Sequence, residues 1–146
     1  FGLDGVHVTL DFVHTVVRDA FAKGFIPFRW DSSTDVEVGI DWECDDDATG
    51  GAVVWGIEYL AIKDNEEVGV AGTEITQAFQ GAGAGLMQRN HFNTKLDHDI
   101  LEADDIIGIR IFRNTTSMDD DLGKTARFLA LHLHFIRNKI GQTTVV

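Results

Sequence analysis

The chain has very little cysteine or proline and no long apolar run. It holds one cysteine, Cys44, so no disulfide can form within it, and its stability must come from a core and from partner subunits. It holds one proline, Pro27, so its turns depend on Gly, Asp and Asn. No apolar run approaches the ~20 residues that cross a bilayer, and the start at Phe1 lacks the segments of a signal peptide. We therefore expect no membrane partner and no signal peptide.

Basic residues are also scarce. The 146 residues include 12 Lys and Arg against 24 Asp and Glu, which gives a formal net charge of -12. Phosphate binding needs a basic surface, so nucleic acid is not expected as a partner. Hydrophobic residues make up 44% and charged residues 25%, a composition typical of a globular protein with a real core. We interpret residues 1–146 as a single domain.

Recognisable catalytic signatures are missing as well. There is no Gly-x-Ser-x-Gly motif, no Ser, His and Asp set in a familiar order, and no phosphate-binding loop. The acidic triplets at 45–47 and 119–121 lack the alternating ligands and terminal Glu of a calcium loop, so we interpret them as solvated turns. We expect no enzymatic activity, no cofactor and no metal.

Alternating apolar and polar residues fill most of the chain. Val36, Val38, Ile40 and Trp42 alternate with Glu37, Gly39, Asp41 and Glu43, and a period of two places the two sets on opposite faces of a strand. Similar patterns predict about eight strands, over 5–15, 21–30, 35–44, 52–62, 68–79, 91–101, 106–113 and 125–137.

Two segments leave alternatives open. Residues 15–23 could form a short helix instead, and 68–79 could be a long loop or an irregular strand. Strands of this spacing with unequal loops predict an all-β protein, a jelly-roll-like antiparallel β-sandwich, with an immunoglobulin-like sandwich as the second choice.

Two histidines near the end of the chain are candidate binding residues. His132 and His134 lie two apart on a predicted strand, so both project from one face. Cupins, which are also jelly rolls, hold metals with such a pair, but they add a Glu shortly afterwards and a later His, and neither follows here. A cupin-like metalloenzyme is therefore the weakest hypothesis. We expect these rings on the outer face of a sheet or in a subunit interface. His98 has Asp97 and Asp99 on the opposite face of its predicted strand, so they should not converge.

The tryptophans divide into two groups. Trp42 and Trp55 are in phase with apolar neighbours and should be buried. Trp30 ends an aromatic stretch, so we expect it to be the most exposed of the three and a candidate for stacking against a sugar. A carbohydrate-binding module for host recognition is therefore the alternative function.

Several segments resemble structural proteins of tailed-bacteriophage virions. They are Ile26-Pro-Phe-Arg-Trp-Asp31, Val36-Glu-Val-Gly-Ile-Asp-Trp42, Gly51-Ala-Val-Val-Trp-Gly-Ile57, Ile107-Gly-Ile-Arg-Ile-Phe-Arg113 and Leu129-Ala-Leu-His-Leu-His-Phe135. The Gly-Ala stretch from Gly81 to Gly85 does not fit the pattern. The resemblance implies a jelly-roll-like protein, usually a trimer, that serves as a head decoration, head fibre or tail component and has no catalytic residues.

The predicted function is thus a structural virion protein that acts through oligomeric assembly. Its expected partners are further copies of itself, as a homotrimer, and other virion proteins such as the major capsid protein. Its expected location is the virion. Phe128, Ala130 and Ile136 beside His132 and His134 make the second face of the last strand more apolar than a solvated face should be, so we expect that face to be an interface. The candidate binding residues are Trp30, His132 and His134.

Overall fold

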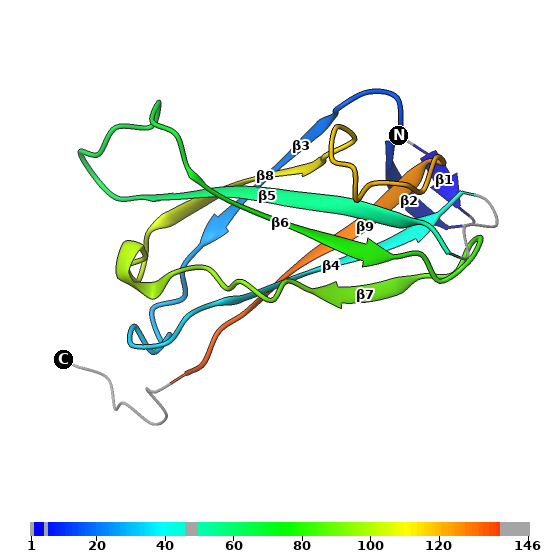
Figure 1. Ribbon diagram of the computed structural model, residues 1–146. Helices are drawn as coiled ribbons and strands as arrows, with labels where there is room; N and C mark the ends of the chain where they lie inside the picture. The colour runs from blue at the N-terminus through cyan, green and yellow to red at the C-terminus, as the bar shows by residue number, and fades with distance from the viewer. Residues whose placement is uncertain (1, 5, 46–49, 138–146) are drawn as a thin grey trace.

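The alternating residues form antiparallel strands in the computed structural model, which describes residues 2–4, 6–45 and 50–137. Within this part of the chain the strands are β1 (Gly2–Asp4), β2 (His7–Phe12), β3 (Asp19–Phe25), β4 (Glu37–Cys44), β5 (Ala52–Ile62), β6 (Thr73–Gln80), β7 (Gln88–His91), β8 (Ile106–Arg113) and β9 (Ala126–His134). One sheet has the order β1-β2-β9-β4-β7, and the other has the order β3-β8-β5-β6. Figure 1 shows the two sheets as stacked layers.

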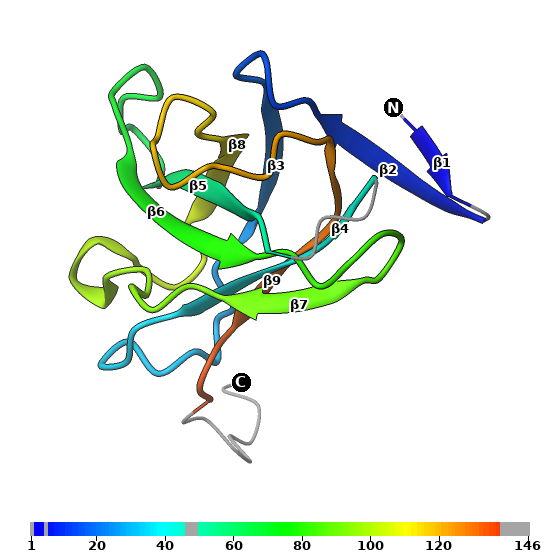
Figure 2. The same ribbon diagram turned by 45° about the vertical axis from the view of Figure 1, so that its right-hand side comes forward.

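The strand order is that of a jelly roll. Apart from the three-residue β1, four strands ordered 2-9-4-7 lie against four strands ordered 3-8-5-6. Most consecutive strands lie in opposite sheets, as two Greek keys arrange them in a jelly roll. The predicted jelly-roll-like sandwich is therefore confirmed, and the immunoglobulin-like order is wrong. Figure 2 shows the β1–β2 hairpin extending away from the body of the sandwich.

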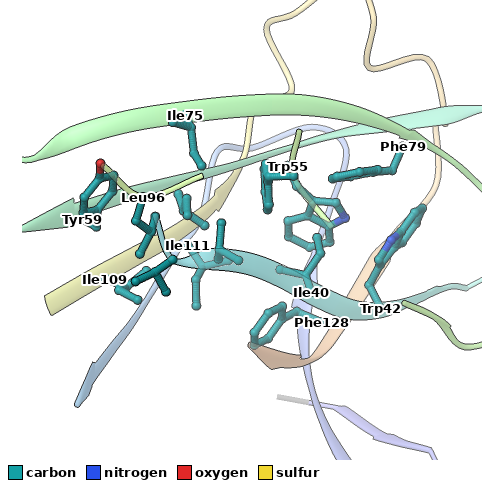
Figure 3. Packing of buried hydrophobic residues seen from close by; sticks show 14 of the residues in the cluster. Ile40, Trp42, Trp55, Tyr59, Ile75, Phe79, Leu96, Ile109, Ile111 and Phe128 are labelled. Carbon is teal, nitrogen blue, oxygen red and sulfur yellow. The ribbon is translucent and has the colours of Figure 1, made fainter. Parts of the chain in front are cut away.

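The core lies between the sheets and is centred on Trp55 of β5 (Figure 3). The centroid of its ring lies 5.0 Å from that of Phe12, 6.0 Å from that of Trp42 and 6.2 Å from that of Phe128. Edge-on and tilted aromatic pairs of this kind add roughly 0.5–1.5 kcal/mol each beyond their burial. The inward rows of β4 and β5 are those that the alternation predicted. The buried residues are Val38, Ile40 and Trp42 of β4, Val53, Trp55, Ile57 and Tyr59 of β5, and Val36 just before β4.

A β-bulge in β9 changes which of its residues face the core. Asp41 and Trp42 are consecutive on β4, but they lie opposite Ala130 and Phe128, so Leu129 is an extra residue. Phe128 is consequently buried in the core at 7% exposure, whereas Ala130 lies on the outer side with the polar residues. The prediction that Phe128 lies on the outer face of this strand, beside Ala130 and His132, is therefore wrong.

The predicted strand over 91–101 is also wrong. β7 ends at His91, and a single 3-10 turn, η1, follows at His98–Ile100. Leu96 is buried because its backbone pairs with Val36, with N to O distances of 2.9 and 3.1 Å in the two directions. An irregular segment therefore supplies core side chains that an alternating pattern attributes to a strand. In the described part of the chain, no helix has the length and hydropathy needed to cross a membrane.

Other predicted strands are present but shorter or shifted. The strand predicted over 5–15 corresponds to β2, and the one predicted over 21–30 corresponds to β3, which ends before Pro27. Within 68–79 only the part from Thr73 is a strand, β6. The alternative of a helix over 15–23 is wrong, because β3 begins there and pairs with β8.

Candidate functional site

Three histidines gather around Gly39 on the outer face of the sheet β2-β9-β4-β7. His132 lies opposite Gly39 on β9, and His91 lies opposite it on β7. His134 follows two residues after His132 and projects from the same face, as the spacing predicted. The ring centroid of His134 is 5.2 Å from that of His91 and 6.3 Å from that of His132. We call these three residues the histidine cluster.

Within the cluster, His132 is paired with an acid. Its Nε2 lies 2.8 Å from Oδ2 of Asp41, at an angle outside hydrogen-bond geometry. Arg89 donates two hydrogen bonds of 2.8 Å to the same carboxylate, from Nε to Oδ1 and from Nη2 to Oδ2. The Arg89 guanidinium, with a smaller contribution from His132, holds the pKa of Asp41 below its ordinary value. His132 thus lies beside the ion pair between Arg89 and Asp41.

Glu37 faces His134 at the other end of the cluster. Oε2 of Glu37 lies 3.9 Å from Nδ1 of His134, while Oε1 accepts a hydrogen bond of 2.9 Å from Nζ of Lys95. The bond from Lys95 holds the pKa of Glu37 below its ordinary value, so this carboxylate is ionised at neutral pH. One ligand atom from each of Glu37, His91 and His134 lies within 4.8 Å of the others, so these three side chains could hold a metal ion.

A second group of acids surrounds His98, which corrects the prediction that its flanking acids point away. The turn η1 bends the chain, so Nδ1 of His98 lies 2.7 Å from Oδ1 of Asp35 and Nε2 lies 3.3 Å from Oδ1 of Asp99. The contact with Asp35 raises the pKa of His98 and lowers that of Asp35. Asp97 caps the turn by accepting the N–H of Asp99. These contacts fasten η1 to the segment before β4.

Trp30 is buried, so the prediction that it is exposed is wrong. Only 1% of its surface is exposed, and its Nε1 donates a hydrogen bond of 3.1 Å to the carbonyl of Thr34. The ring of Phe135 meets it edge-on, with centroids 6.4 Å apart. Because neighbouring residues cover the indole, it offers no free surface for stacking against a sugar.

The outer face of the other sheet is apolar at one end. Phe25, Ile106 and Ile62 lie side by side across β3, β8 and β5. Phe25 is 72% exposed, and Val68 from the loop after β5 is 73% exposed. A groove of about 410 Å³ runs over this surface with Gly108 in its floor. We call this surface the apolar face; it comprises Phe21, Phe25, Leu60, Ile62, Val68, Val70 and Ile106.

Charged residues border the apolar face. Arg110 of β8 lies 2.9 Å from an oxygen of Glu58, 3.2 Å from one of Glu74 and 3.6 Å from one of Asp19. Its guanidinium also lies 4.5 Å from the ring centre of Phe112, a cation–π contact. An apolar patch with a charged rim is the composition typical of a protein–protein interface.

The acidic triplet at 119–121 differs from the prediction of a solvated turn. The side chain of Asp120 is 2% exposed and is paired with the buried Arg113, and Asp121 accepts the N–H of Ala52 at 2.6 Å. Asp46 and Asp47 of the other triplet lie outside the described residues.

Sequence reasoning missed Glu37 and His91 as neighbours of His134. The alternation had placed Glu37 on the outward side of its strand, but it did not show that β4 lies between β9 and β7. No model of a known protein family matches the chain, and no curated protein matches it. The geometry of the two outer faces is therefore the basis for any functional argument.

Proposed function

We propose that this chain is a structural protein of a tailed-bacteriophage virion, a head decoration, head fibre or tail component that acts through oligomeric assembly. We favour a homotrimer that also contacts other virion proteins, such as the major capsid protein. The observation that supports this proposal is the apolar face, because an exposed apolar patch of this kind is typical of a protein–protein interaction site.

The exposure of this face is high for a soluble surface. Phe21 is 76% exposed and Phe25 is 72% exposed; on β3, Phe25 pairs with the exposed Ile106, and Phe21 pairs with Arg110 further along β8. Burial of two such side chains would contribute roughly 3–6 kcal/mol before the entropic cost of association. An interface at this face would therefore be favourable.

The edge of the same sheet points to the same kind of partner. Among the residues that the structure describes, β3 is an edge strand, with β8 on one side and no strand of this sheet on the other. An edge strand has unpaired backbone groups that can pair with a second chain. A second copy could thus cover both the edge and the neighbouring apolar side chains. Since each copy carries a net charge of -12, association should strengthen with ionic strength.

The resemblance to phage proteins is compatible with this fold. Four of the five resembling segments coincide with β4, β5, β8 and β9, which are the central strands of the two sheets. The resemblance thus concerns the framework of the sandwich, and the fold alone does not decide function.

Light scattering coupled to gel filtration tests the assembly. We expect an oligomer for the native chain and a shift towards monomer for the double variant Phe21→Ser with Phe25→Ser. Both residues are exposed, so the variant should fold normally. Met118→Ser is the matched control, because Met118 is 98% exposed in a loop away from the apolar face. A monomeric native chain at all concentrations, or equal effects of both variants, would count against the interface.

Mass spectrometry of purified particles tests the location. Particles of the phage that encodes the chain should contain it after gradient purification, in a fixed ratio to the major capsid protein. Its absence from intact particles, with the protein present in the infected lysate, would refute the virion role even if the oligomer forms.

The alternative function is a carbohydrate-binding module. Trp30, the residue predicted to stack against a sugar, is buried and cannot do so. Exposed aromatic rings remain at Phe21, Phe25 and Phe28. Binding on a glycan array that survives competition by unrelated proteins and disappears in Phe28→Ala would revive this alternative.

A further inference from the structure

Two histidines and a glutamate converge on the outer face of the sheet β2-β9-β4-β7. His134 lies directly opposite Glu37, and His91 lies opposite Gly39, two residues further along β4. The two histidines thus come from the strands on either side of β4. One ligand atom from each of the three side chains lies within 4.8 Å of the others.

Gly39 makes this convergence possible. The strands β9 and β7 are separated by β4, so side chains that rise straight from them would stand about two strand spacings, roughly 10 Å, apart. The rings of His91 and His134 are much closer, with centroids at 5.2 Å. A Cβ atom on Gly39 would lie 3.0 Å from Nδ1 of His91 and 2.9 Å from the carbonyl oxygen of Asn90. The missing side chain therefore leaves the space in which the His91 ring lies over β4.

Glycine weakens the interior of a strand, and it often marks a place where another group approaches closely. Gly39 lies in the middle of β4, which is paired on both sides. Here the approaching group is an imidazole that meets a second imidazole.

The carboxylate is suited to a cation. Oε1 of Glu37 accepts the hydrogen bond from Lys95, and Oε2 is turned towards His134. The hydrogen bond from Lys95 fixes the orientation of the carboxylate, as outer partners do at known metal sites. All three candidate ligands are exposed, so an ion can reach them from solvent.

The geometry points to a binding site for one divalent transition-metal ion of the zinc class, with Glu37, His91 and His134 as ligands. Imidazole nitrogens suit zinc, nickel and copper, whereas calcium and magnesium prefer oxygen ligands. Three protein ligands leave at least one position for water or for a ligand from another molecule.

In the sequence, only His132 with His134 was a candidate pair for a histidine-bound metal, and the Glu and the later His of a cupin do not follow His134 along the chain. In the structure Glu37 lies on β4, His91 on β7 and His134 on β9, so the three ligands come from three neighbouring strands. They also lie on the outer face, whereas a cupin-type pair would have to face the interior of the sandwich to be enclosed.

The separations predict moderate affinity. Ligand atoms about 2.0–2.1 Å from a tetrahedral zinc ion lie roughly 3.3 Å from one another. The three side chains must therefore close from up to 4.8 Å, which exposed rotamers can do at some cost in entropy. We expect a dissociation constant in the micromolar range.

Isothermal titration of the full chain with zinc, in protein without a histidine tag, tests the site. We expect one ion per chain, and His91→Ala and His134→Ala should each weaken binding at least tenfold, since loss of even an outer partner weakens metal affinity by roughly 10–100-fold. Glu37→Gln should also weaken it. His14→Ala is the matched control, because His14 is exposed and lies outside the cluster. An absence of saturable binding, or equal affinity in all four variants, would overturn the proposal.

Two further variants separate this arrangement from other nearby groups. His132→Ala should keep the affinity within about twofold of the native value, because His132 contacts Asp41 and is not a ligand; a loss as large as that of His134→Ala would contradict the assignment. Gly39→Ala keeps all three ligands but occupies the space of the His91 ring, so it should weaken binding while the circular dichroism spectrum is retained. Native affinity in Gly39→Ala would show that the rings do not converge over β4. Both measurements use the isolated chain, so they stand apart from the test of virion assembly.

Discussion

A buried ion pair between Arg113 and Asp120 should be one of the strongest determinants of stability. Arg113 is fully buried at the end of β8, and the side chain of Asp120 is 2% exposed. Nη2 of Arg113 donates to Oδ1 of Asp120 at 2.6 Å, and Nε donates to Oδ2 at 2.9 Å. Nη1 of Arg113 donates to the carbonyls of Phe12 and Lys124, and Asp120 accepts the N–H of Val54 at 3.0 Å. The pair thus connects β2, β5 and β8 with the loop after β8.

Asp120→Ala would leave the guanidinium of Arg113 buried without its counter-charge. Removal of one member of a buried pair typically costs about 3–5 kcal/mol, because the remaining charge is neither solvated nor neutralised. The N–H of Val54 would also lose its acceptor, so we expect the upper part of that range. A loss of about 4 kcal/mol corresponds to a fall of roughly 8–16 °C in Tm for a domain of this size.

Urea denaturation followed by tryptophan fluorescence would measure this loss, because all three tryptophans are buried. Asp119→Ala is the control, since Asp119 is exposed in the same loop and should change stability by less than about 0.5 kcal/mol. In the double variant Arg113→Met with Asp120→Ala, no charge is left unpaired, so it should be more stable than Asp120→Ala alone. A loss below about 1 kcal/mol in Asp120→Ala, or the same loss in Asp119→Ala, would refute this reasoning.

Three further predictions concern buried or paired side chains. Trp30→Ala should lower the free energy of unfolding by about 3–5 kcal/mol, measured by urea denaturation, because it empties a core position. The thiol of Cys44 is buried and its pKa is raised by desolvation, so a thiol reagent should label it only after denaturation; rapid labelling of the native chain would contradict the burial. Because Arg89 lowers the pKa of Asp41, that carboxylate stabilises the fold above the ordinary Asp pKa of about 3.9, and this contribution disappears as the pH falls through the lowered native value. The stability of Arg89→Gln should therefore decline less between about pH 5 and pH 2 than that of the native chain, and parallel declines would contradict it.

The layered architecture and the main core rows could be predicted from the sequence because they depend on local alternation. A period of two identifies the inward side of β4 and β5 without any knowledge of their partners. The inward rows that include Trp42 and Trp55 were therefore predicted correctly. The same reasoning placed His132 and His134 on one face, because the bulge in β9 lies before them at Leu129.

The other features depend on contacts between distant segments, which alternation does not contain. In a regular strand Phe128 and Ala130 would lie on the same face. The bulge puts them on opposite faces, so a strict alternation cannot place both correctly. Leu96 is buried through a backbone pairing with Val36, although neither residue lies within a strand. The meeting of His91 with His134 requires β4 to lie between β7 and β9, and the sequence holds no local signal for that order.

Glycines in the central strands mark positions where the outer face of a sheet has space for another group. Gly39 gives space to the ring of His91, and a Cβ on Gly56 would lie 2.2 Å from the ring of Phe112, which covers that position. Gly108 has no such neighbour. A Cβ added there would meet only the carbonyl oxygen of Leu60, at 3.9 Å, so the groove that Gly108 lines stays open at this position. Glycine inside a strand destabilises the fold by about 0.5–1 kcal/mol relative to alanine, so each of these three residues lowers the stability of the protein. At Gly39 and Gly56 the missing side chain is filled from a neighbouring strand, whereas at Gly108 the space faces solvent within the apolar face. Gly108 therefore lies open to solvent within the apolar face, on the sheet opposite to the histidine cluster, where we propose the assembly contact.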